Sequence, residues 1–276
     1  MFRERARSAA ILVPLLGVVL WLDGPWFVAL IAIAVVLGAR EAFRLLEAAG
    51  HTAFPALGVV LALVVALGDL IPSTPAGSGL LLAAVGMVFA GAAALTRTDP
   101  REGLVAFAVT TFGALYVGLL GFALRLATVA PDVPDDAPLA FLGAERGWLV
   151  VLILGVWAFD TGAYLVGSRW GRRRFMAHIS ATKTVEGVLG GTLAATLVTT
   201  LLVVGLGQSG LAGLVLGPVI AASAQAGDLA ESMLKRAAGA RDSGRLIPGH
   251  GGMLDRLDSF LFAAPAVVLY VVIAFR

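Results

Sequence analysis

Apolar residues occur along this chain in long continuous runs, separated by short breaks that are polar or contain glycine or proline. A helix that crosses a bilayer needs about 20 mainly apolar residues, with a range of about 17–25. The runs therefore predict an all-α, polytopic integral membrane protein with about nine transmembrane helices. Their approximate bounds are 8–22, 25–43, 53–71, 79–96, 103–129, 148–168, 187–207, 211–234 and 259–275. The first two runs also fit a hairpin that does not cross fully twice.

Composition supports this fold class. Of the 276 residues, 59% are hydrophobic and 14% are charged, whereas a soluble domain carries about 25% charged residues. Cysteine is absent, which excludes a disulfide framework, a thiolate metal site and a cysteine nucleophile. The N-terminus resembles a signal peptide, but no clear small-residue cleavage site follows, so we interpret it as the first membrane helix.

The basic residues predict the orientation of the chain. Nearly all of the 20 Lys and Arg residues fall at the N-terminus or in alternate loops on one side of the predicted spans. Arg146 and Arg276 fall on the other side, and Arg125 lies inside a span. Because cytoplasmic loops carry the excess of Lys and Arg, the N-terminus and both large charged loops are expected in the cytoplasm, with the chain in the cytoplasmic (inner) membrane.

The distribution of polar residues divides the chain into two parts. Residues 1–146 hold about five predicted helices with short loops. Residues 147–276 hold about four helices, two charged cytoplasmic loops and nearly every polar group with a plausible chemical role. Because charge inside a membrane segment is costly, this second part is where we expect the functional site.

Asp160 is an acid inside a predicted span, about two turns from its cytoplasmic end. As a structural group it would form hydrogen bonds to neighbouring helices, and as a functional group it would face a polar cavity. Gly162 and Gly167 lie nearby and permit close approach of a helix or a ligand.

The loop 168–186 is rich in basic and hydroxyl residues. Its arginines alone indicate topology and contacts with anionic lipids. Ser180, Lys183 and Thr184 come just before the next predicted helix, where hydroxyls, an ammonium group and the positive helix end can bind phosphate. Serine and threonine at such positions also commonly only cap helices. The glycines that follow favour tight packing of that helix; they are Gly187, Gly190 and Gly191.

Paired acids mark the last two predicted spans. Asp228, Glu231 and Lys235 share one helix face and either serve a site or form an internal ladder of ion pairs. Asp255 and Asp258 are also three residues apart, and two such carboxylates repel unless a cation lies between them. Mg²⁺ relieves that repulsion and commonly binds one or two carboxylates together with substrate phosphates. Acids, Mg²⁺ and cations at the membrane surface indicate phosphoryl or nucleotidyl transfer between a lipid and a soluble phosphate donor.

At these residues the chain resembles the phosphatidate cytidylyltransferases, also called CDP-diacylglycerol synthases. Ser232 to Asp258 follows the family signature S-x-apolar-K-R-x4-K-D-x-small-x2-apolar-P-x-H-G-G-apolar-x-D-R-apolar-D without a gap, with Arg241 in place of its second Lys. Three shorter motifs also match: Gly227-Asp-Leu-Ala-Glu-Ser232, Asp160-Thr-Gly-Ala-Tyr164, and Ile179-Ser-Ala-Thr-Lys-Thr-Val-Glu-Gly187, in which Ala181 replaces the family's Pro. The resemblance is specific over about 150–260 and general elsewhere.

The resemblance implies transfer of CMP from CTP to phosphatidic acid, with Mg²⁺ and with K⁺ as a second cation. It implies that Asp228, Asp255 and Asp258 bind the metal and that Lys183 joins them in the catalytic set. It also implies that the remaining polar and glycine positions of the motifs bind substrate: Asp160, Ser180, Thr184, Lys235, Arg236, Arg241, His250, Gly251, Gly252 and Arg256. It further implies a homodimer, while no nucleic acid partner is expected.

Three other classes of protein fit parts of the pattern. A CTP-dependent lipid-alcohol kinase would use similar groups but transfer the γ-phosphate, so its products would differ. An ion-coupled transporter would place acids near the bilayer midplane and show repeated halves, whereas these acids cluster at one side and no repeat is visible. A non-catalytic scaffold would not need so many costly polar groups.

Overall fold

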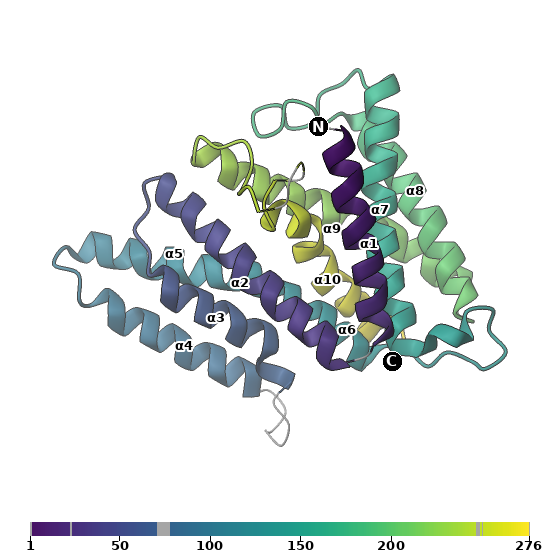
Figure 1. Cartoon of the computed structure of the whole chain (residues 1–276), viewed down its shortest axis with the longest axis horizontal. Coiled ribbons are helices and arrows are strands. Elements are labelled where there is room, and N and C mark those ends of the chain that lie inside the picture. Colours follow the sequence, from purple (N-terminus) through teal and green to yellow (C-terminus); the bar gives the residue numbers. More distant parts are fainter. Residues whose placement is uncertain (1, 23, 71–77, 247–248, 250, 276) are drawn as a thin grey trace. The chain divides into compact units, whose positions relative to one another are not determined.

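The fold is a set of helices joined by loops (Figure 1), and the computed structural model describes residues 2–22, 24–70, 78–246, 249 and 251–275. Three short 3₁₀ turns, η1 (Gly68–Leu70), η2 (Leu119–Gly121) and η3 (Ala140–Leu142), adjoin the α-helices. The α-helices are α1 (Phe2–Trp21), α2 (Gly24–Ala48), α3 (Pro55–Leu67), α4 (Ser78–Ala94), α5 (Pro100–Gly118), α6 (Phe122–Val129), α7 (Gly143–Trp170), α8 (Val185–Gly205), α9 (Gly210–Ala237) and α10 (Leu254–Ala274).

The observed helices follow the predicted apolar runs, which confirms the all-α membrane fold. The fifth predicted run is continuous in sequence but consists of α5, η2 and α6. Within the described residues, six helical segments are long and apolar enough to cross a membrane, whereas α3 and α4 are shorter apolar helices. The count of about nine crossings therefore stays a prediction.

The chain forms two compact units, which we call the first and second unit. The first unit contains residues 1–121 and 233–257, and the second contains residues 122–232 and 258–276. Residues 233–257, which come late in the sequence, belong to the same compact unit as the N-terminal helices. The division at residue 146 was based on polar content, which is a different criterion, and it stays a prediction.

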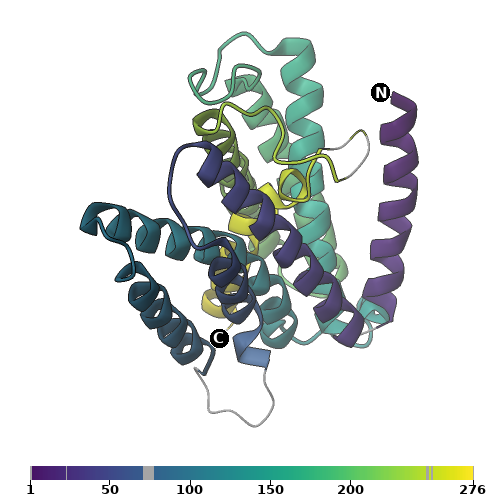
Figure 2. The same ribbon diagram turned by 60° about the vertical axis from the view of Figure 1, so that its left-hand side comes forward.

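In the first unit, α3 packs against α2, α4 and α5, and Figure 2 shows these helices from a second direction. Glycine positions allow the close contacts. A methyl group on Gly113 of α5 would lie 2.8 Å from the ring of Phe43 on α2. A methyl group on Gly118 would lie 2.6 Å from the Val65 side chain of α3. The buried Phe43 ring therefore fills space that glycine leaves open.

In the second unit, α7 and α8 form a close helix pair through small residues. A methyl group on Gly191 of α8 would lie 2.6 Å from the carbonyl oxygen of Phe159 on α7. On α7, a methyl group on Gly162 would lie 2.7 Å from Cβ of Ala194. Small residues are what allow membrane helices to approach so closely. The tight packing predicted for the α8 glycines is thus confirmed, and the partner at Gly162 is a helix.

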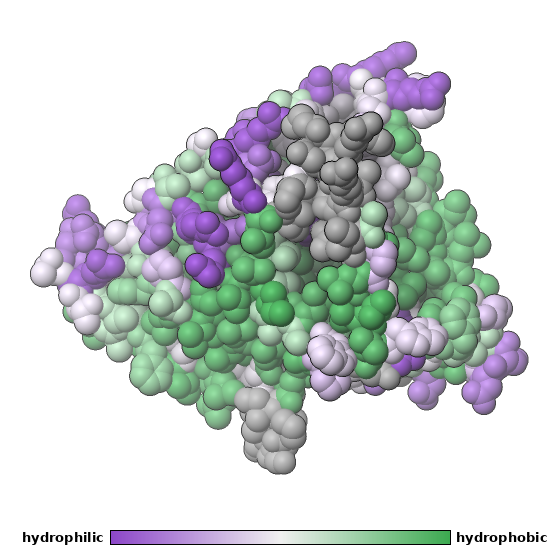
Figure 3. Space-filling model, in the orientation of Figure 1, coloured by the Kyte–Doolittle hydropathy of each residue, from purple (hydrophilic) through white to green (hydrophobic). Residues whose placement is uncertain are grey.

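Large apolar side chains cover much of the outer helix surface. Leu193 and Leu197 of α8 are 73% and 62% exposed, and Leu80 of α4 is 78% exposed. Figure 3 shows hydrophobic residues spread over the helices of the visible face and hydrophilic residues gathered near helix ends and loops. Contiguous exposed apolar surface of this kind is typical of a membrane-facing protein.

Candidate active site

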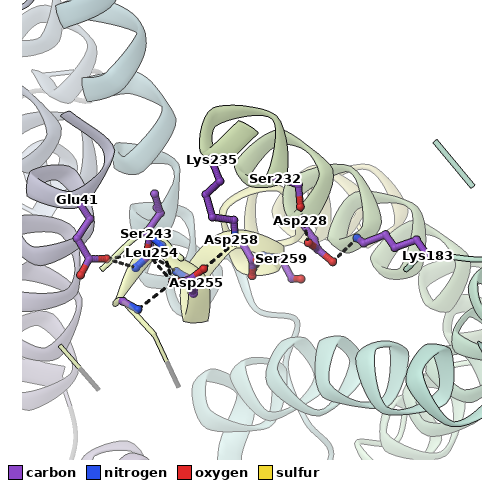
Figure 4. Close-up of polar contacts among 11 residues, drawn as sticks. Glu41, Lys183, Asp228, Ser232, Lys235, Ser243, Leu254, Asp255, Asp258 and Ser259 are labelled. Atoms are coloured by element: carbon purple, nitrogen blue, oxygen red, sulfur yellow. Dashed lines mark hydrogen bonds and ion pairs between the residues drawn. The ribbon is translucent and has the colours of Figure 1, made fainter. Parts of the chain in front are cut away.

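The polar cluster of the second unit is centred on an ion pair between Lys183 and Asp228. The Lys183 ammonium donates to Oδ2 of Asp228 on α9, and both side chains are partly buried. The Ser232 hydroxyl, one turn further along α9, lies 3.4 Å from the other carboxylate oxygen. Figure 4 shows the lysine extending toward the acid from a separate segment of chain. Two residues that the sequence assigned to catalysis are therefore in direct contact.

Lys183 is held by a narrow hairpin between α7 and α8. Arg174 and Thr184 form an isolated antiparallel bridge. The backbone N–H of Phe175 donates to the Lys183 carbonyl at 2.9 Å, and that of Val185 donates to the Arg173 carbonyl at 2.9 Å. These bonds fix the backbone from the Lys183 carbonyl to Val185, so the lysine side chain leaves the loop from a defined position.

The carboxylate of Glu186 closes this hairpin. It accepts hydrogen bonds from the backbone N–H groups of Arg172, at 3.0 Å, and Arg173, at 3.1 Å. The buried Thr184 caps α8, since its hydroxyl oxygen accepts from Gly187 N–H at 3.1 Å. The structure thus gives Thr184 the capping role that the sequence left open. The role of Glu186 was missed because its partners are backbone groups, which leave no side-chain pattern.

Asp258 lies in the same unit, where α10 packs against α9. Gly227, the residue before Asp228, faces the backbone of α10, and a methyl group there would collide with the Asp258 carbonyl oxygen. The Asp258 carboxylate accepts a hydrogen bond from Ser259 N–H at 2.7 Å. Glycine therefore brings the backbone of one predicted metal-binding acid next to the segment that carries another.

The polar cluster of the first unit is centred on Asp255, in the first turn of α10. Its Oδ1 lies 2.7 Å from the Lys235 ammonium. Its Oδ2 accepts from the backbone N–H of Gly252 at 2.8 Å, and from the backbone N–H and hydroxyl of Ser243 at 2.9 and 2.8 Å. Both oxygens are engaged, so the carboxylate is fixed in position.

Glu41 of α2 completes this cluster, and the sequence analysis missed it. Its side chain is buried, and its Oε2 accepts from the Ser243 hydroxyl at 3.0 Å and from Leu254 N–H at 2.8 Å. Figure 4 shows Glu41 pointing toward Ser243 and Leu254. An acid inside an apolar run is itself a signal for a polar site, but the partners lie about two hundred residues away in sequence.

The acids present are suitable ligands for Mg²⁺. Among the residues that the structure describes, no group of three or more His, Asp or Glu side chains is close enough to hold a metal ion. Mg²⁺ nevertheless usually binds one or two carboxylates and completes its octahedron with water and substrate phosphates. Asp228 and Asp255 offer such carboxylates at helix positions fixed by packing and hydrogen bonds, so the donor chemistry fits the ion.

The remaining predicted residues occupy varied environments. Asp160 is exposed on α7, Ser180 is half-buried in the hairpin, and His250 lies outside the described residues. Gly251 has a left-handed backbone, and the Gly252 N–H serves Asp255. The three arginines predicted to bind substrate are exposed: Arg236, Arg241 and Arg256.

Comparison with known proteins indicates one family. A family model described as the cytidylyltransferase family matches residues 3–274. The chain is 35% identical to a phosphatidate cytidylyltransferase of Synechocystis sp., over 98% of this chain and 96% of the relative. It is 34% identical to phosphatidate cytidylyltransferase 5, chloroplastic, of Arabidopsis thaliana, over 91% of this chain and 67% of the relative. A phosphatidate cytidylyltransferase of Staphylococcus aureus (strain COL) is 41% identical over 43% of this chain and 46% of the relative.

The long apolar helices are those of a polytopic membrane protein, and the matching family model and relatives identify a nucleotidyl-transfer enzyme. The chain belongs to the cytidylyltransferase family, since the family model covers almost its whole length.

Proposed function

We propose that this protein transfers CMP from CTP to phosphatidic acid, giving CDP-diacylglycerol and pyrophosphate. The observation that carries the proposal is the contact between Lys183 and Asp228, which joins two of the motifs that resemble the family. Nucleotidyl transfer needs cations near the phosphates and acids that hold the metal, because its catalysis consists mainly of positioning and charge stabilisation. The names of the relatives support the same reaction.

In the proposed reaction, a phosphate oxygen of phosphatidic acid attacks the α-phosphorus of CTP. The new P–O bond forms as the bond to the β-phosphate oxygen breaks, and pyrophosphate leaves with the electron pair. A phosphate monoester is already largely ionised near neutral pH, because its second pKa is about 6. The protein therefore needs neither its own nucleophile nor a strong general base.

The lysines would bind phosphate oxygens in this reaction. A lysine ammonium has three N–H donors, so Lys183 can keep its bond to Asp228 while it donates to a phosphate. The N-terminus of α8, two residues further on, adds positive potential for an anion. Lys235, Arg236 and Arg241 are proposed to contact the other phosphates.

Asp228, Asp255 and Asp258 are proposed to hold Mg²⁺, which would supply positive charge for the departing pyrophosphate. Lys183 and Lys235 neutralise Asp228 and Asp255 when no substrate is bound. K⁺ as a second cation and assembly as a homodimer are further proposals that rest on the family resemblance. Omission of K⁺ from the assay and light scattering of the purified protein would test them.

The deciding experiment is a turnover assay on purified protein in mixed micelles, with labelled CTP, phosphatidic acid and Mg²⁺. Mass spectrometry identifies the products, and EDTA provides the control. CDP-diacylglycerol and pyrophosphate that form only with metal would support the proposal. CDP and a phosphorylated lipid, formed when a lipid alcohol replaces phosphatidic acid, would replace it with the lipid-kinase function. No turnover with either lipid would favour a transporter.

We also propose that the hairpin between α7 and α8 lies on the cytoplasmic side of the inner membrane. The chain contains no cysteine, so single cysteines can be labelled without background. Arg173→Cys should react with an impermeant maleimide only from the cytoplasmic side, and Asp136→Cys only from the opposite side. The reverse pattern would overturn the orientation.

A further inference from the structure

We infer that Glu41 is a positioning residue, which holds the Asp255 carboxylate in place through Ser243 and the N-terminus of α10. The inference rests on the proposed function, because it assigns Glu41 a part in the transfer reaction. Nothing in the sequence motifs includes this residue, which lies in the second predicted membrane span, far from the family signature.

The first observation is the burial and bonding of the Glu41 carboxylate. The residue is 2% exposed, and its Oε2 accepts two hydrogen bonds, from the Ser243 hydroxyl and from Leu254 N–H. Leu254 is the first residue of α10. The first N–H groups of a helix have no partner within the helix and carry its positive end. Glu41 therefore satisfies and neutralises the start of the helix that carries Asp255.

The second observation is the space around the carboxylate. Gly244 and Gly252 both face it, and a methyl group on either would collide with a Glu41 carboxylate oxygen. Gly38, one turn earlier on α2, faces α10, and a methyl group there would lie 3.4 Å from Leu257 and 3.9 Å from Leu254. Gly244 and Gly252 therefore leave room for this one side chain, whereas a methyl group on Gly38 would make only ordinary contacts with the α10 leucines.

The third observation is the connection through Ser243 to Asp255. The Ser243 hydroxyl oxygen lies 3.0 Å from Glu41 Oε2 and 2.8 Å from Asp255 Oδ2, and it accepts from Asp255 N–H at 3.2 Å. A serine hydroxyl has one hydrogen and two lone pairs, so both carboxylates share one donor. Movement of Glu41 would therefore change the hydrogen bonding of Ser243 and, through it, that of Asp255.

Burial of a carboxylate is costly unless it is well bonded, and an apolar side chain would pack an α2–α10 contact at less cost. Groups that orient a metal-binding residue commonly matter 10–100-fold for metal affinity or activity. The arrangement therefore fits a residue that sets the geometry of Asp255 rather than one that only stabilises the fold.

The test compares Glu41→Ala, Glu41→Gln and Ser243→Ala with the control Glu47→Ala, an exposed acid on the same helix. We expect Glu41→Ala to lower kcat by about 10–100-fold and to raise the Mg²⁺ concentration for half-maximal rate by a similar factor. The KM for phosphatidic acid should stay near that of the wild type. Glu41→Gln keeps one acceptor oxygen for Leu254 and Ser243 and should recover most of the rate.

Ser243→Ala cuts the connection to Asp255 but keeps the bond from Glu41 to Leu254. If Glu41 acts through Ser243, the double variant Glu41→Ala/Ser243→Ala should lose little more activity than the less active of the two single variants. The effects of coupled residues are not additive. Losses that multiply in the double variant would overturn the inference. A normal kcat for Glu41→Ala would also overturn it.

A second measurement separates this inference from the proposed function. Hydrogen exchange of the amides in residues 243–255 reports the order of the segment without any substrate. Glu41→Ala should speed exchange at Leu254 and Asp255, and Glu47→Ala should not. Absence of wild-type turnover would defeat the proposed function, while the exchange result would still decide whether Glu41 orders this segment. Unchanged exchange in Glu41→Ala would defeat the inference even in a fully active enzyme.

Discussion

The Lys235 ammonium lies 2.7 Å from Oδ1 of Asp255, and the two side chains are only 15% and 8% exposed. Because the other Asp255 oxygen is bonded to Ser243 and Gly252, the lysine meets a carboxylate that cannot rotate away. The pair therefore places one positive and one negative group at fixed positions in the first unit.

Asp255→Asn should lower kcat by at least about 100-fold, beyond the usual effect of a residue that only orients a ligand. An amide has one oxygen, so it can accept from Lys235 or from the backbone N–H groups, and its NH₂ group then faces the other donors. Steady-state kinetics and a melting curve in detergent check this. Asp136→Asn, the same change at an exposed loop acid, should behave as wild type; a near-normal rate for Asp255→Asn would remove it from the catalytic set.

Removal of divalent metal with EDTA should abolish turnover, and added Mg²⁺ should restore it. In Asp228→Asn the Mg²⁺ concentration for half-maximal rate should rise by about tenfold or more, because a neutral amide is a weaker ligand for a hard cation. Glu145→Gln, an exposed acid in the first turn of α7, is the control. A Mg²⁺ response of Asp228→Asn that matches the control would contradict the metal assignment.

Glu186→Ala should loosen the hairpin that carries Lys183, since it removes the acceptor for the N–H groups of Arg172 and Arg173. We expect faster tryptic cleavage at the exposed arginines of the loop and a fall in kcat/KM of about tenfold, the lower end of the effect of orienting residues. Glu145→Ala also removes an acid from the first turn of a helix, so it controls for the helix dipole. Equal cleavage rates in the two variants would show that Glu186 does not hold the loop.

Gly227→Ala should destabilise the protein by about 1–3 kcal/mol, the usual cost of an overpacked contact. The added methyl group would collide with the Asp258 carbonyl oxygen, so α9 and α10 must separate beside Asp228. Turnover should fall as well. Gly17→Ala on α1 meets no atom within 4 Å and should be neutral or more stable by up to about 1 kcal/mol through helix propensity. Similar melting temperatures for both variants would argue against the close contact.

The helices could be predicted because each membrane helix corresponds to a local feature of the sequence, a run of apolar residues of the required length. The break inside the fifth run was not visible, because it depends on a distant contact. A methyl group on Gly121 would collide with the backbone of Ala66 on α3, and that proximity has no signal in the sequence around η2.

The site was predictable only where its residues lie in motifs. Lys183 and Asp228 come from two recognisable motifs, and the structure joins them. The Thr184 hydroxyl suits both helix capping and phosphate binding, so sequence alone could not choose; the structure shows the capping bond, and phosphate binding stays a prediction. Glu41 was missed because its partners, Ser243 and Leu254, become neighbours only when residues 233–257 fold with the N-terminal helices.

The two faces of α8 have a consequence for how this sequence can change over time. The buried face repeats at four-residue intervals through Gly191, Ala195 and Thr199, whereas Leu189, Leu193, Leu197 and Leu201 repeat on the exposed face. A lipid-facing position accepts almost any apolar side chain, while a position packed against a helix backbone is limited by volume. Related sequences should therefore interchange leucine, isoleucine, valine and phenylalanine freely along the outer face, and interchange only glycine, alanine, serine and threonine along the inner one.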